Sequence, residues 1–420
     1  MRIERLKVEK SREVANVRLY GIQSYGEYND YPQRVMEIVE QSITGQGCLD
    51  IYQKFVYGRG FTIVDFGKAV CNSRGETFDY VLGECAKDYA MFGGFALHIN
   101  YNALGEGVSL CHFPFECLRL EALTEDKKIA RKVAYHPDWG KRNTKLRPFK
   151  VEDIEWFNLF DNRKEVILRE VEEAGGWNGY KGQILYFSNA GKAVYPTPIY
   201  SASLTDMSSE EGLSNITLRN ARFNFLPSGM FIDKDNTANS DEQQAVKRKE
   251  LNEFQGDTNA GKMLYINLLN GEEAPEFRSF VGENYDQAFR NSEERVPLRI
   301  GRAFHQPPVL RADDSANGFD TQRIKQAYNF YNSLTESERE KLSEAFRIVC
   351  TNFEHIVNPE GDFYILPKRY EVTETLAERL GANIDRVLEI ISAESVDGER
   401  KRVVLREIYG IDDDIIDKLL

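Results

Sequence analysis

One stretch of the sequence imitates a phosphate-binding loop. Residues 256–263 read GDTNAGKM, which places Lys262 where a nucleotide-binding lysine would stand, but Met263 follows it. A phosphate loop needs Ser or Thr at that position to hold Mg²⁺, and it must join a strand to a helix N-terminus. Here the pattern predicts a helix before the loop and a strand after it. We therefore expect no nucleotide site, no cofactor and no enzymatic activity.

Other combinations of reactive side chains give even weaker evidence for a catalytic or metal site. Cys111, His112 and Cys117 are close in sequence, but strand alternation sends the first two to opposite faces, and no second ligand pair stands at zinc spacing. Neither a GxSxG nor an HExxH motif occurs. The six cysteines include no CxxC pair, which indicates free thiols in a reducing compartment. The sequence thus predicts neither catalytic residues nor a metal site.

A stripe of arginines is the best candidate for a binding surface. Arg295, Arg299 and Arg302 fall on one face of a predicted helix at about 100° per residue. A second face is apolar and consists of Tyr285, Phe289, Val296, Ile300 and Ala303. The arginines also fit an ordinary solvated face with salt bridges to Glu293 and Glu294, and the stripe alone does not separate these interpretations.

The arginine helix belongs to a larger unit. Pro297 should kink the helix, Pro307-Pro308 stops it, and a polar loop without apolar periodicity follows. A second helix begins near Asp320, a suitable N-cap, and turns apolar side chains inward at Ile324, Ala327, Tyr328 and Tyr331. The pattern predicts a helix, a double-proline stop, a polar loop and a second helix.

Composition limits the class of protein. The chain has 420 residues, 41% hydrophobic and 29% charged, which fits a globular protein of about two or three domains. No apolar run approaches the ~18 residues of a membrane span, and the charged N-terminus lacks the apolar segment of a secretory signal. The net charge of -13 disfavours tight duplex binding over the whole surface but allows a local basic lining.

Alternating helix and strand patterns predict an α+β fold, whose first half is a mostly antiparallel meander. In that half the expected helices are 31–57, ending at Gly58, and 78–93; the expected strands are 61–66, 94–102, 108–123, 132–137, 154–160 and 183–189. Later helices are expected at 197–229, 241–254 and 335–353, strands at 261–269 and 362–372, and small helices in the last ~45 residues. A capping box at Thr335 and Glu338 should begin the helix 335–353.

Taken in order, several segments resemble those of the portal proteins of tailed bacteriophages. CLDIYQKFVYGRGF (48–61) resembles the family's helix that ends in a Gly-x-Gly turn. FQGDTNAGKMLYINL (254–268) resembles its helix, turn and strand, which gives the false phosphate loop a structural role. IGRAFHQPPVL (300–310) is similar to a segment ending in Pro-Pro, with Gln306 where an apolar residue is common. Further similar segments are YAMFGGFALHI (89–99), FPFECLRL (113–120), YPTPIYSA (195–202) and ARFNFLPSGMFI (221–232).

This resemblance implies a multi-domain subunit with an α+β wing, two stem helices, a small α/β clip and an α-helical crown. The N-terminal part of the wing would be 1–202, and the tunnel loop, long helix and returning wing strand would be 307–375. The stem helices would be 203–227 and 282–306, the clip 228–281 and the crown 376–420.

The same resemblance implies a homo-oligomeric ring, a dodecamer, at one capsid vertex of the virion, assembled in the host cytoplasm. Double-stranded DNA would pass through its channel during packaging and ejection without sequence-specific contacts. The terminase, the head–tail adaptor and the major capsid or scaffold protein would be its partners, and a membrane would not. The alternatives are a packaging ATPase of the same assembly and another capsid-associated adaptor or scaffold protein.

The resemblance also places stem and tunnel-loop side chains beside passing DNA. The expected channel-lining residues are Arg295, Arg299, Arg302, Arg311, Asp313, Asp314 and Asn317. Alternatively, the three stem arginines pair with acids of the adjacent stem helix, such as Glu210 or Glu211. At the level of sequence both arrangements stay open.

Overall fold

The computed structural model describes residues 19–123, 129–139, 150–190, 194–223, 229–232, 276–279, 285–311, 321–354, 362–370, 390–392, 397–407 and 416. Two compact units divide the chain: Met1–Gly318 with Gln326–Lys368, and Phe319–Lys325 with Arg369–Leu420. Within the second unit, helix α12 lies in the region where small helices are expected. The sheets and the helices that pack around the larger one belong to the first unit.

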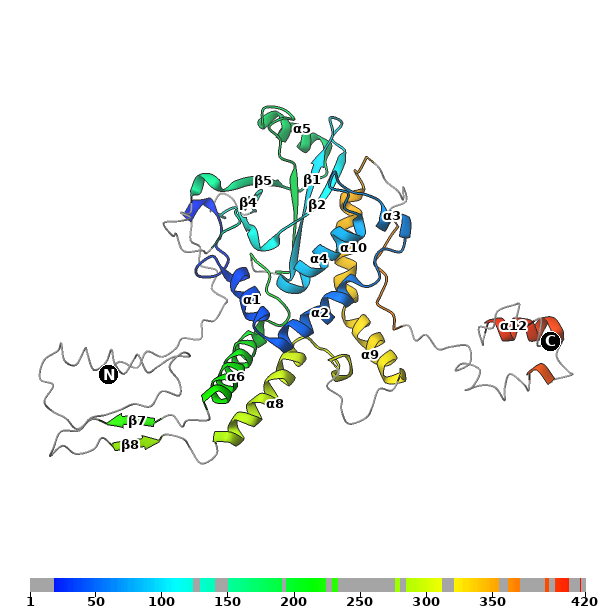
Figure 1. Cartoon of the computed structure of the whole chain (residues 1–420). Helices are drawn as coiled ribbons and strands as arrows, with labels where there is room; N and C mark the ends of the chain where they lie inside the picture. Colours follow the sequence, from blue (N-terminus) through cyan, green and yellow to red (C-terminus); the bar gives the residue numbers. More distant parts are fainter. Residues whose placement is uncertain are drawn as a thin grey trace, which may run out of the picture. The chain divides into compact units, whose positions relative to one another are not determined.

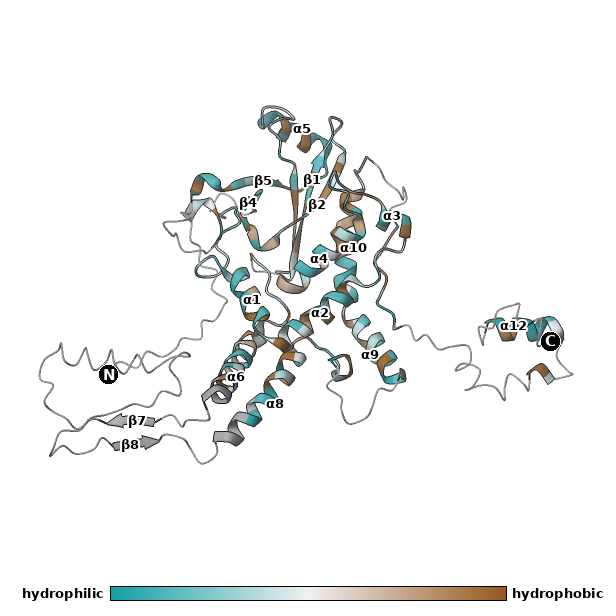
Figure 2. Ribbon diagram, viewed as in Figure 1, coloured by the Kyte–Doolittle hydropathy of each residue, from teal (hydrophilic) through white to brown (hydrophobic). Residues whose placement is uncertain are grey.

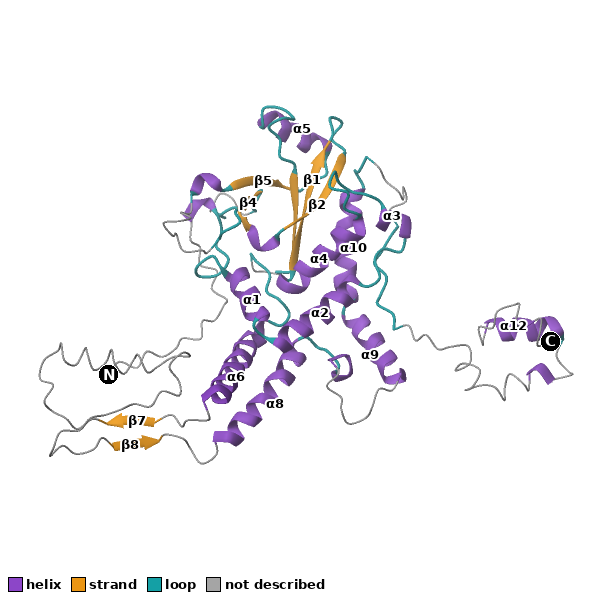
Figure 3. Cartoon of the chain, in the orientation of Figure 1, coloured by secondary structure: helices purple, strands orange, loops and turns teal. Residues whose placement is uncertain are grey.

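A six-stranded sheet organises the first unit, with the strand order β2-β1-β6-β5-β4-β3. Its strands are drawn in orange in Figure 3. Its strands are β1 (Gly94–Tyr101), β2 (Gly107–Phe113), β3 (Leu118–Leu120), β4 (Lys132–Tyr135), β5 (Glu155–Leu159) and β6 (Gln183–Ser188); a separate antiparallel pair is β7 (Gly229–Ile232) and β8 (Glu276–Ser279). Neighbouring strands of the larger sheet are antiparallel except β5 and β6, which are parallel. The α+β class is as expected, but β6 lies between β1 and β5, so the sheet is not a simple meander.

Helices pack against this sheet and against one another (Figure 1). The helices that lie wholly or partly in the first unit are α1 (Tyr31–Glu40), α2 (Ile43–Tyr57), α3 (Val64–Lys68), α4 (Phe78–Phe92), α5 (Lys164–Glu173), α6 (Leu204–Phe223), α8 (Tyr285–Ala303), α9 (Thr321–Leu334) and α10 (Glu336–Cys350), whereas α12 (Gly398–Glu407) belongs to the second unit. Helix α4 contacts β1 and β2, and the expected helix 78–93 and strand 94–102 are confirmed. Thr77 caps α4 by accepting a hydrogen bond from Tyr80 N, and Gly93 ends it in the left-handed conformation.

The strand expected at 61–66 is wrong over most of its length. Phe61 forms only an isolated bridge with Ile365, and helix α3 follows directly. Phe66 of α3 stacks on Phe78, with ring centroids 4.4 Å apart. A short apolar run is compatible with a strand or with a buried helix, and the aromatic packing of Phe66 favours the helix here.

Three other elements differ from the expected extents. The helical region 31–57 is broken at Ser42, which becomes the N-cap of α2. The region 108–123 contains two strands, β2 and β3, separated by the 3₁₀ turn Phe115–Cys117. The described part of 362–372 contributes one bridged residue and no regular strand. The alternation of apolar residues therefore predicted which segments are extended. It did not predict at which residues their hydrogen-bonded pairing with a neighbouring strand begins and ends.

The capping box expected at Thr335 and Glu338 is wrong. Thr335 occupies the N-cap position of α10, but its side chain makes no capping hydrogen bond to that helix. Instead Thr335 Oγ1 donates to Tyr331 O at 2.9 Å and accepts from Arg339 Nη1 at 2.7 Å. The buried Arg339 thus engages the hydroxyl that would otherwise cap the helix.

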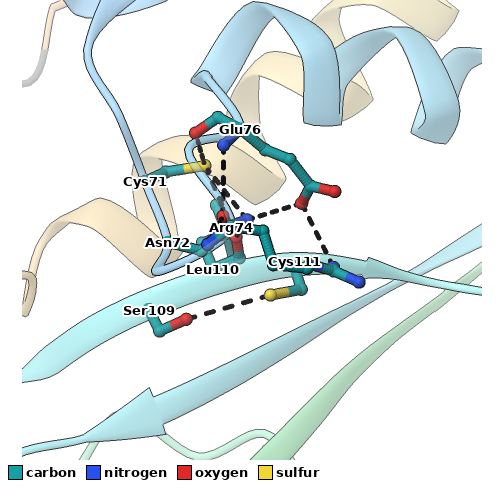
Figure 4. A network of polar contacts seen from close by, with 7 residues as sticks. All are labelled: Cys71, Asn72, Arg74, Glu76, Ser109, Leu110 and Cys111. Atoms are coloured by element: carbon teal, nitrogen blue, oxygen red, sulfur yellow. Dashed lines mark hydrogen bonds and ion pairs between the residues drawn. The ribbon is translucent and has the colours of Figure 1, made fainter.

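The outer edge of β2 is covered by the turn between Cys71 and Glu76 (Figure 4). Leu110 of β2 donates its N–H to Cys71 O at 2.8 Å, and its carbonyl accepts from Asn72 Nδ2 at 3.0 Å. Asn72 Oδ1 accepts from the backbone N–H of Glu76 at 3.2 Å, which fixes the turn. The backbone of Leu110 is therefore already paired within the chain and does not offer itself to another strand.

The opposite edge strand, β3, is covered by the chain segment before α1. Gln23 N donates to Leu120 O at 2.8 Å, and Ala122 N donates to Gly21 O at 2.8 Å. Leu120 N donates to Tyr195 Oη at 2.9 Å. Because both edges of the sheet are paired at these positions, association of copies by strand addition there is disfavoured.

The core of the first unit is rich in aromatic side chains and contains most of the cysteines. All six cysteines are free thiols, and only Cys111 is partly exposed. Burial raises the pKa of Cys71 and Cys117 to about 12, so both stay uncharged near neutral pH. None of the described helices is both long and apolar enough to cross a membrane.

Candidate functional site

Helices α6 and α8 lie side by side although they are far apart in sequence (Figure 1). Arg299 of α8 pairs with Asp206 near the start of α6, with 2.6 Å between Nη2 and Oδ1. Thr217 Oγ1, later in α6, donates to Glu293 Oε1, earlier in α8, at 3.4 Å. The two helices are therefore antiparallel, and the chain between them contains the strand pair β7 and β8.

Helix α6 is anchored at the N-terminus of α2 by Glu210. Its carboxylate accepts hydrogen bonds from Ser42 Oγ, from Thr44 Oγ1 at 2.5 Å and from Thr44 N at 3.2 Å. Ser42 Oγ also accepts from Gly45 N at 2.9 Å as the N-cap of α2. A carboxylate at a helix N-terminus is stabilised by the helix dipole and by otherwise free N–H groups. Glu210 thus fixes the angle at which α6 leaves the core.

Helix α8 is anchored by the apolar face expected from its sequence. The side chains of Val296 and Ile300 are buried, as is Phe304 just beyond the helix. Phe304 stacks on Tyr200, with ring centroids 4.6 Å apart. An offset aromatic stack of this kind adds about 0.5–1.5 kcal/mol beyond the burial of its area. The C-terminal half of α8 is therefore held firmly against the core.

Gln306 fastens the end of α8 to two other helices. Its buried Nε2 donates to Cys48 O of α2 at 2.6 Å and to Tyr331 Oη of α9 at 3.3 Å. Tyr331 Oη donates in turn to Phe304 O at 3.0 Å. Burial raises the pKa of Tyr331, so the hydroxyl keeps the proton that it donates. The hydrogen bonds of its amide therefore explain why a polar side chain is buried at position 306.

Arg311, expected to line a channel, lies against α8. Its Nη1 donates to Pro297 O at 3.4 Å. The guanidinium covers Gly301 so closely that an added Cβ there would come within 1.3 Å of Nη1. Glycine inside a helix costs about 1 kcal/mol of stability relative to alanine. The close approach of Arg311 explains why glycine stands at position 301 nevertheless.

The three arginines of the stripe share an exposed face of α8. Arg299 is paired with Asp206, although its side chain remains 55% exposed. Arg295 and Arg302 form no ion pair or hydrogen bond with another residue in the described part of the chain. Of the acids named as alternative partners, Glu210 binds α2, and Glu211 meets none of these arginines within the chain.

A groove of about 560 Å³ lies between α6 and α8. Its apolar walls are lined by Leu213, Leu218, Val296 and Pro297, and its polar lining consists of Glu210, Ser214, Thr217 and Glu293. Hydrophilic and hydrophobic residues both occur along the described parts of the two helices (Figure 2). At about 100° per residue, Glu293 lies roughly 160° around α8 from Arg295. Arg295 and, by the same spacing, Arg302 therefore lie on the side of this helix opposite the groove, whereas Arg299 faces α6 through its pair with Asp206.

The remaining candidates for chemistry do not join this site. Among the described residues no group of three or more His, Cys, Asp or Glu side chains could hold a metal ion. Cys111 Sγ lies 3.8 Å from Ser109 Oγ, whereas His112 Nε2 lies 2.7 Å from Asp88 Oδ2. Several predictions fall outside the described residues: the false phosphate loop with Lys262 and Met263, the elements expected at 241–254 and 261–269, and the loop residues Asp313, Asp314 and Asn317.

Sequence reasoning missed the partners of Arg299 and Arg311. Asp206 stands four residues before Glu210, which puts both carboxylates on one face of α6 and was the available signal. Gly301, an isolated glycine inside a helical pattern, was the signal for the close approach of Arg311.

Comparison with known proteins gives structural neighbours only. No protein-family model matches the chain, and no curated protein sequence matches it. The neighbours include a chain in the virion of a native gene transfer agent particle, with 14% identity, a TM-score of 0.47 and coverage of 90% of this chain and 93% of that one. A chain in the neck of an empty gene transfer agent particle computed with C6 symmetry has 13% identity, a TM-score of 0.48 and coverage of 91% and 94%. An HK97-family phage portal protein from Corynebacterium diphtheriae has 10% identity, a TM-score of 0.36 and coverage of 69% and 81%.

Proposed function

We propose that the protein is a phage portal subunit, which forms a closed homo-oligomeric ring at one capsid vertex and surrounds the channel through which DNA is packaged and ejected. In this proposal, 1–202 form most of the wing, 203–227 and 282–306 are the stem helices, and 228–281 form the clip. The tunnel loop, the long helix and the returning wing strand lie within 307–375, and 376–420 form the crown.

The observation that carries this proposal is the antiparallel pair of α6 and α8. Two helices from separate parts of the sequence lie together, held to each other by Arg299 and Asp206, and enclose an inserted segment with its own strand pair. This is the order of stem, clip and stem that the sequence resemblance implies. The pair has one anchored apolar side and exposed polar sides, as a helix between a core and a channel requires.

The chemistry of the chain suits the passage of DNA. A net charge of -13 keeps phosphate contacts sparse, so that a duplex slides instead of binding tightly. We assign the channel surface to the tunnel loop with Asp313, Asp314 and Asn317, which follows Arg311. The clip is assigned to docking of the terminase and later of the head–tail adaptor, and the wing to contacts with the capsid or scaffold protein.

This function requires no catalysis by the chain itself. The motor that consumes ATP is a separate partner, and Met263 replaces the hydroxyl that a phosphate loop uses to hold Mg²⁺. The purified protein is therefore expected neither to bind nor to hydrolyse ATP. Saturable ATP binding that is lost in Lys262→Ala would contradict the proposal and favour the packaging ATPase.

The location of the protein in particles separates the remaining alternatives. In assembled particles of the virus or element that encodes the chain, a gold-labelled antibody should mark one vertex per particle. Particles assembled without the chain should lack DNA. Label distributed over the whole shell would overturn the proposal and indicate a scaffold or capsid component.

A further inference from the structure

Helix α8 carries an exposed ridge on the side away from the groove. Arg295, Leu298 and Arg302 follow one another at spacings of three and four residues, so they share one face. The side chain of Leu298 is 41% exposed, which leaves an apolar group between two cations. Neither Arg295 nor Arg302 has an ionic partner among the described residues, in contrast to Arg299. The ridge thus has both charge and apolar area to offer to another molecule.

The groove between α6 and α8 has the complementary character. Leu218 and Pro297 contribute to its apolar walls, and Leu218 is 45% exposed. Glu210 and Glu293 contribute carboxylates, although that of Glu210 also binds Ser42 and Thr44, and the described residues that line the groove include no arginine or lysine. A groove with apolar walls and two carboxylates fits an apolar side chain flanked by cations.

We infer that the ridge of one copy docks in the α6–α8 groove of the next copy. This inference rests on the ring proposed above and names the surfaces that join its subunits. Ridge and groove lie on opposite sides of α8, so each copy can use both at once. Such a head-to-tail contact closes into a ring when its rotation divides a full turn. A two-fold dimer would use one self-complementary patch instead.

The rest of the fold supports this route of association. The outer edges of β2 and β3 are already paired through Leu110 and Leu120, so the larger sheet does not present these positions to another copy. Charge also indicates whether DNA or a second copy of the chain would occupy the groove. DNA phosphates would be repelled by Glu210 and Glu293, whereas the arginines of the ridge would be attracted.

Charge reversal of the full-length protein tests this docking. Arg295→Glu with Arg302→Glu gives a ridge variant, and Ser214→Arg with Glu293→Arg gives a groove variant. Each variant alone should lose the ring and sediment as subunits, because like charges then face each other. An equimolar mixture should regain rings, because the reversed ridge fits the reversed groove and the native ridge fits the native groove. Arg163→Glu with Arg169→Glu, on and beside the exposed α5, is the matched control and should assemble like the native protein.

The outcomes separate the inference from the proposed function. If the native protein forms rings and both variants also form them, or the mixture of folded variants stays dissociated, the docking is wrong while the ring stands. If the native protein forms no ring, the proposed function itself fails. If the ridge variant forms normal rings but its particles lose packaged DNA, the arginines face the channel and the docking is again wrong.

A cross-link provides a readout that does not depend on disrupting the contact. Leu298→Cys and Leu218→Cys in one chain place thiols on ridge and groove, at two exposed positions. Mild oxidation should give a ladder of covalent oligomers up to the full ring. Either single variant should give no more than traces of dimer. A double variant that forms rings without a ladder would contradict the docking.

Discussion

Arg299 of α8 and Asp206 of α6 form the ion pair that joins the two helices, with 2.6 Å between Nη2 and Oδ1. Arg299 is thereby distinguished from Arg295 and Arg302, its neighbours on the same stripe, because its charge is already matched within the chain. An arginine that is paired in its own subunit contributes less to contacts with a second copy or with phosphates. The stripe therefore has two parts: Arg299, which is paired within its own subunit, and Arg295 with Arg302, whose charges face outward.

We predict a small coupling energy for this pair. Its side chains are 55% and 22% exposed, and ion pairs near the surface contribute about 0.2–1 kcal/mol. A double-mutant cycle with Arg299→Ala and Asp206→Ala, followed by urea unfolding, should give a coupling in that range that weakens with salt. The same cycle with Arg295→Ala in place of Arg299→Ala should give no coupling. Equal coupling in both cycles would contradict the assignment.

The effect of Gly301→Ala on the stability of the protein should change sign with the residue at position 311. In the native protein, Gly301→Ala should destabilise, because the new Cβ would lie 1.3 Å from Arg311 Nη1 and displace the guanidinium. In an Arg311→Ala background the same change should stabilise by up to about 1 kcal/mol, as alanine does in a free helix interior.

Gly212→Ala on α6 is the control for this reversal, since a Cβ there meets nothing within 4 Å. It should stabilise the protein in both backgrounds. Thermal unfolding midpoints of the variants give the comparison. If Gly301→Ala has the same effect with and without the Arg311 side chain, the close approach of Arg311 is not what requires glycine.

Loss of the Gln306 amide should be costly. Gln306→Ala removes two hydrogen bonds from a buried place, one to Cys48 O at 2.6 Å and one to Tyr331 Oη at 3.3 Å, and each such bond contributes about 0.5–1.5 kcal/mol. The exposed Gln326→Ala on α9 is the matched control and should stay within about 0.5 kcal/mol of the native value. Unfolding free energies in urea measure both. Similar values for the two variants would show that the end of α8 does not depend on this amide.

The pair of His112 and Asp88 should make stability fall with rising pH. Burial lowers the pKa of His112, but the hydrogen bond and the charge of Asp88 outweigh it, so the pKa lies above 6.5. Burial raises the pKa of Asp88, and the hydrogen bond to His112 lowers it in part. The folded protein therefore binds more protons than the unfolded chain, and its stabilisation is fully present below pH 6.5 and lost above the raised pKa of His112.

Unfolding at about pH 6 and about pH 8.5 checks this direction, because the two values bracket the ordinary histidine range. His112→Gln should reduce the loss of stability between them. The control His305→Asn removes an exposed histidine at a left-handed position that asparagine tolerates, and it should keep the native pH dependence. A loss of stability that is unchanged in His112→Gln would contradict the role of the pair.

Local periodicity predicted the elements that form the helix pair but not what joins them. Val296 and Ile300 recur at helical spacing, so the buried face of α8 followed directly from the sequence. The bond from Gln306 to Cys48 and the ion pair from Arg299 to Asp206 link residues that are distant in the chain, and no local pattern encodes them. Tertiary packing also overrode local signals at Phe66, where aromatic neighbours favoured a helix, and at Thr335, where Arg339 engaged the hydroxyl.

Electron microscopy of the purified full-length protein shows whether the chain forms a ring. We expect a closed ring with a single rotation axis, in which α6 and α8 of each copy surround the central opening and touch the same helices of the next copy. Sedimentation should show one large species that persists as the protein is diluted. Monomers at every concentration, or a two-fold dimer without a central opening, would rule out a portal ring.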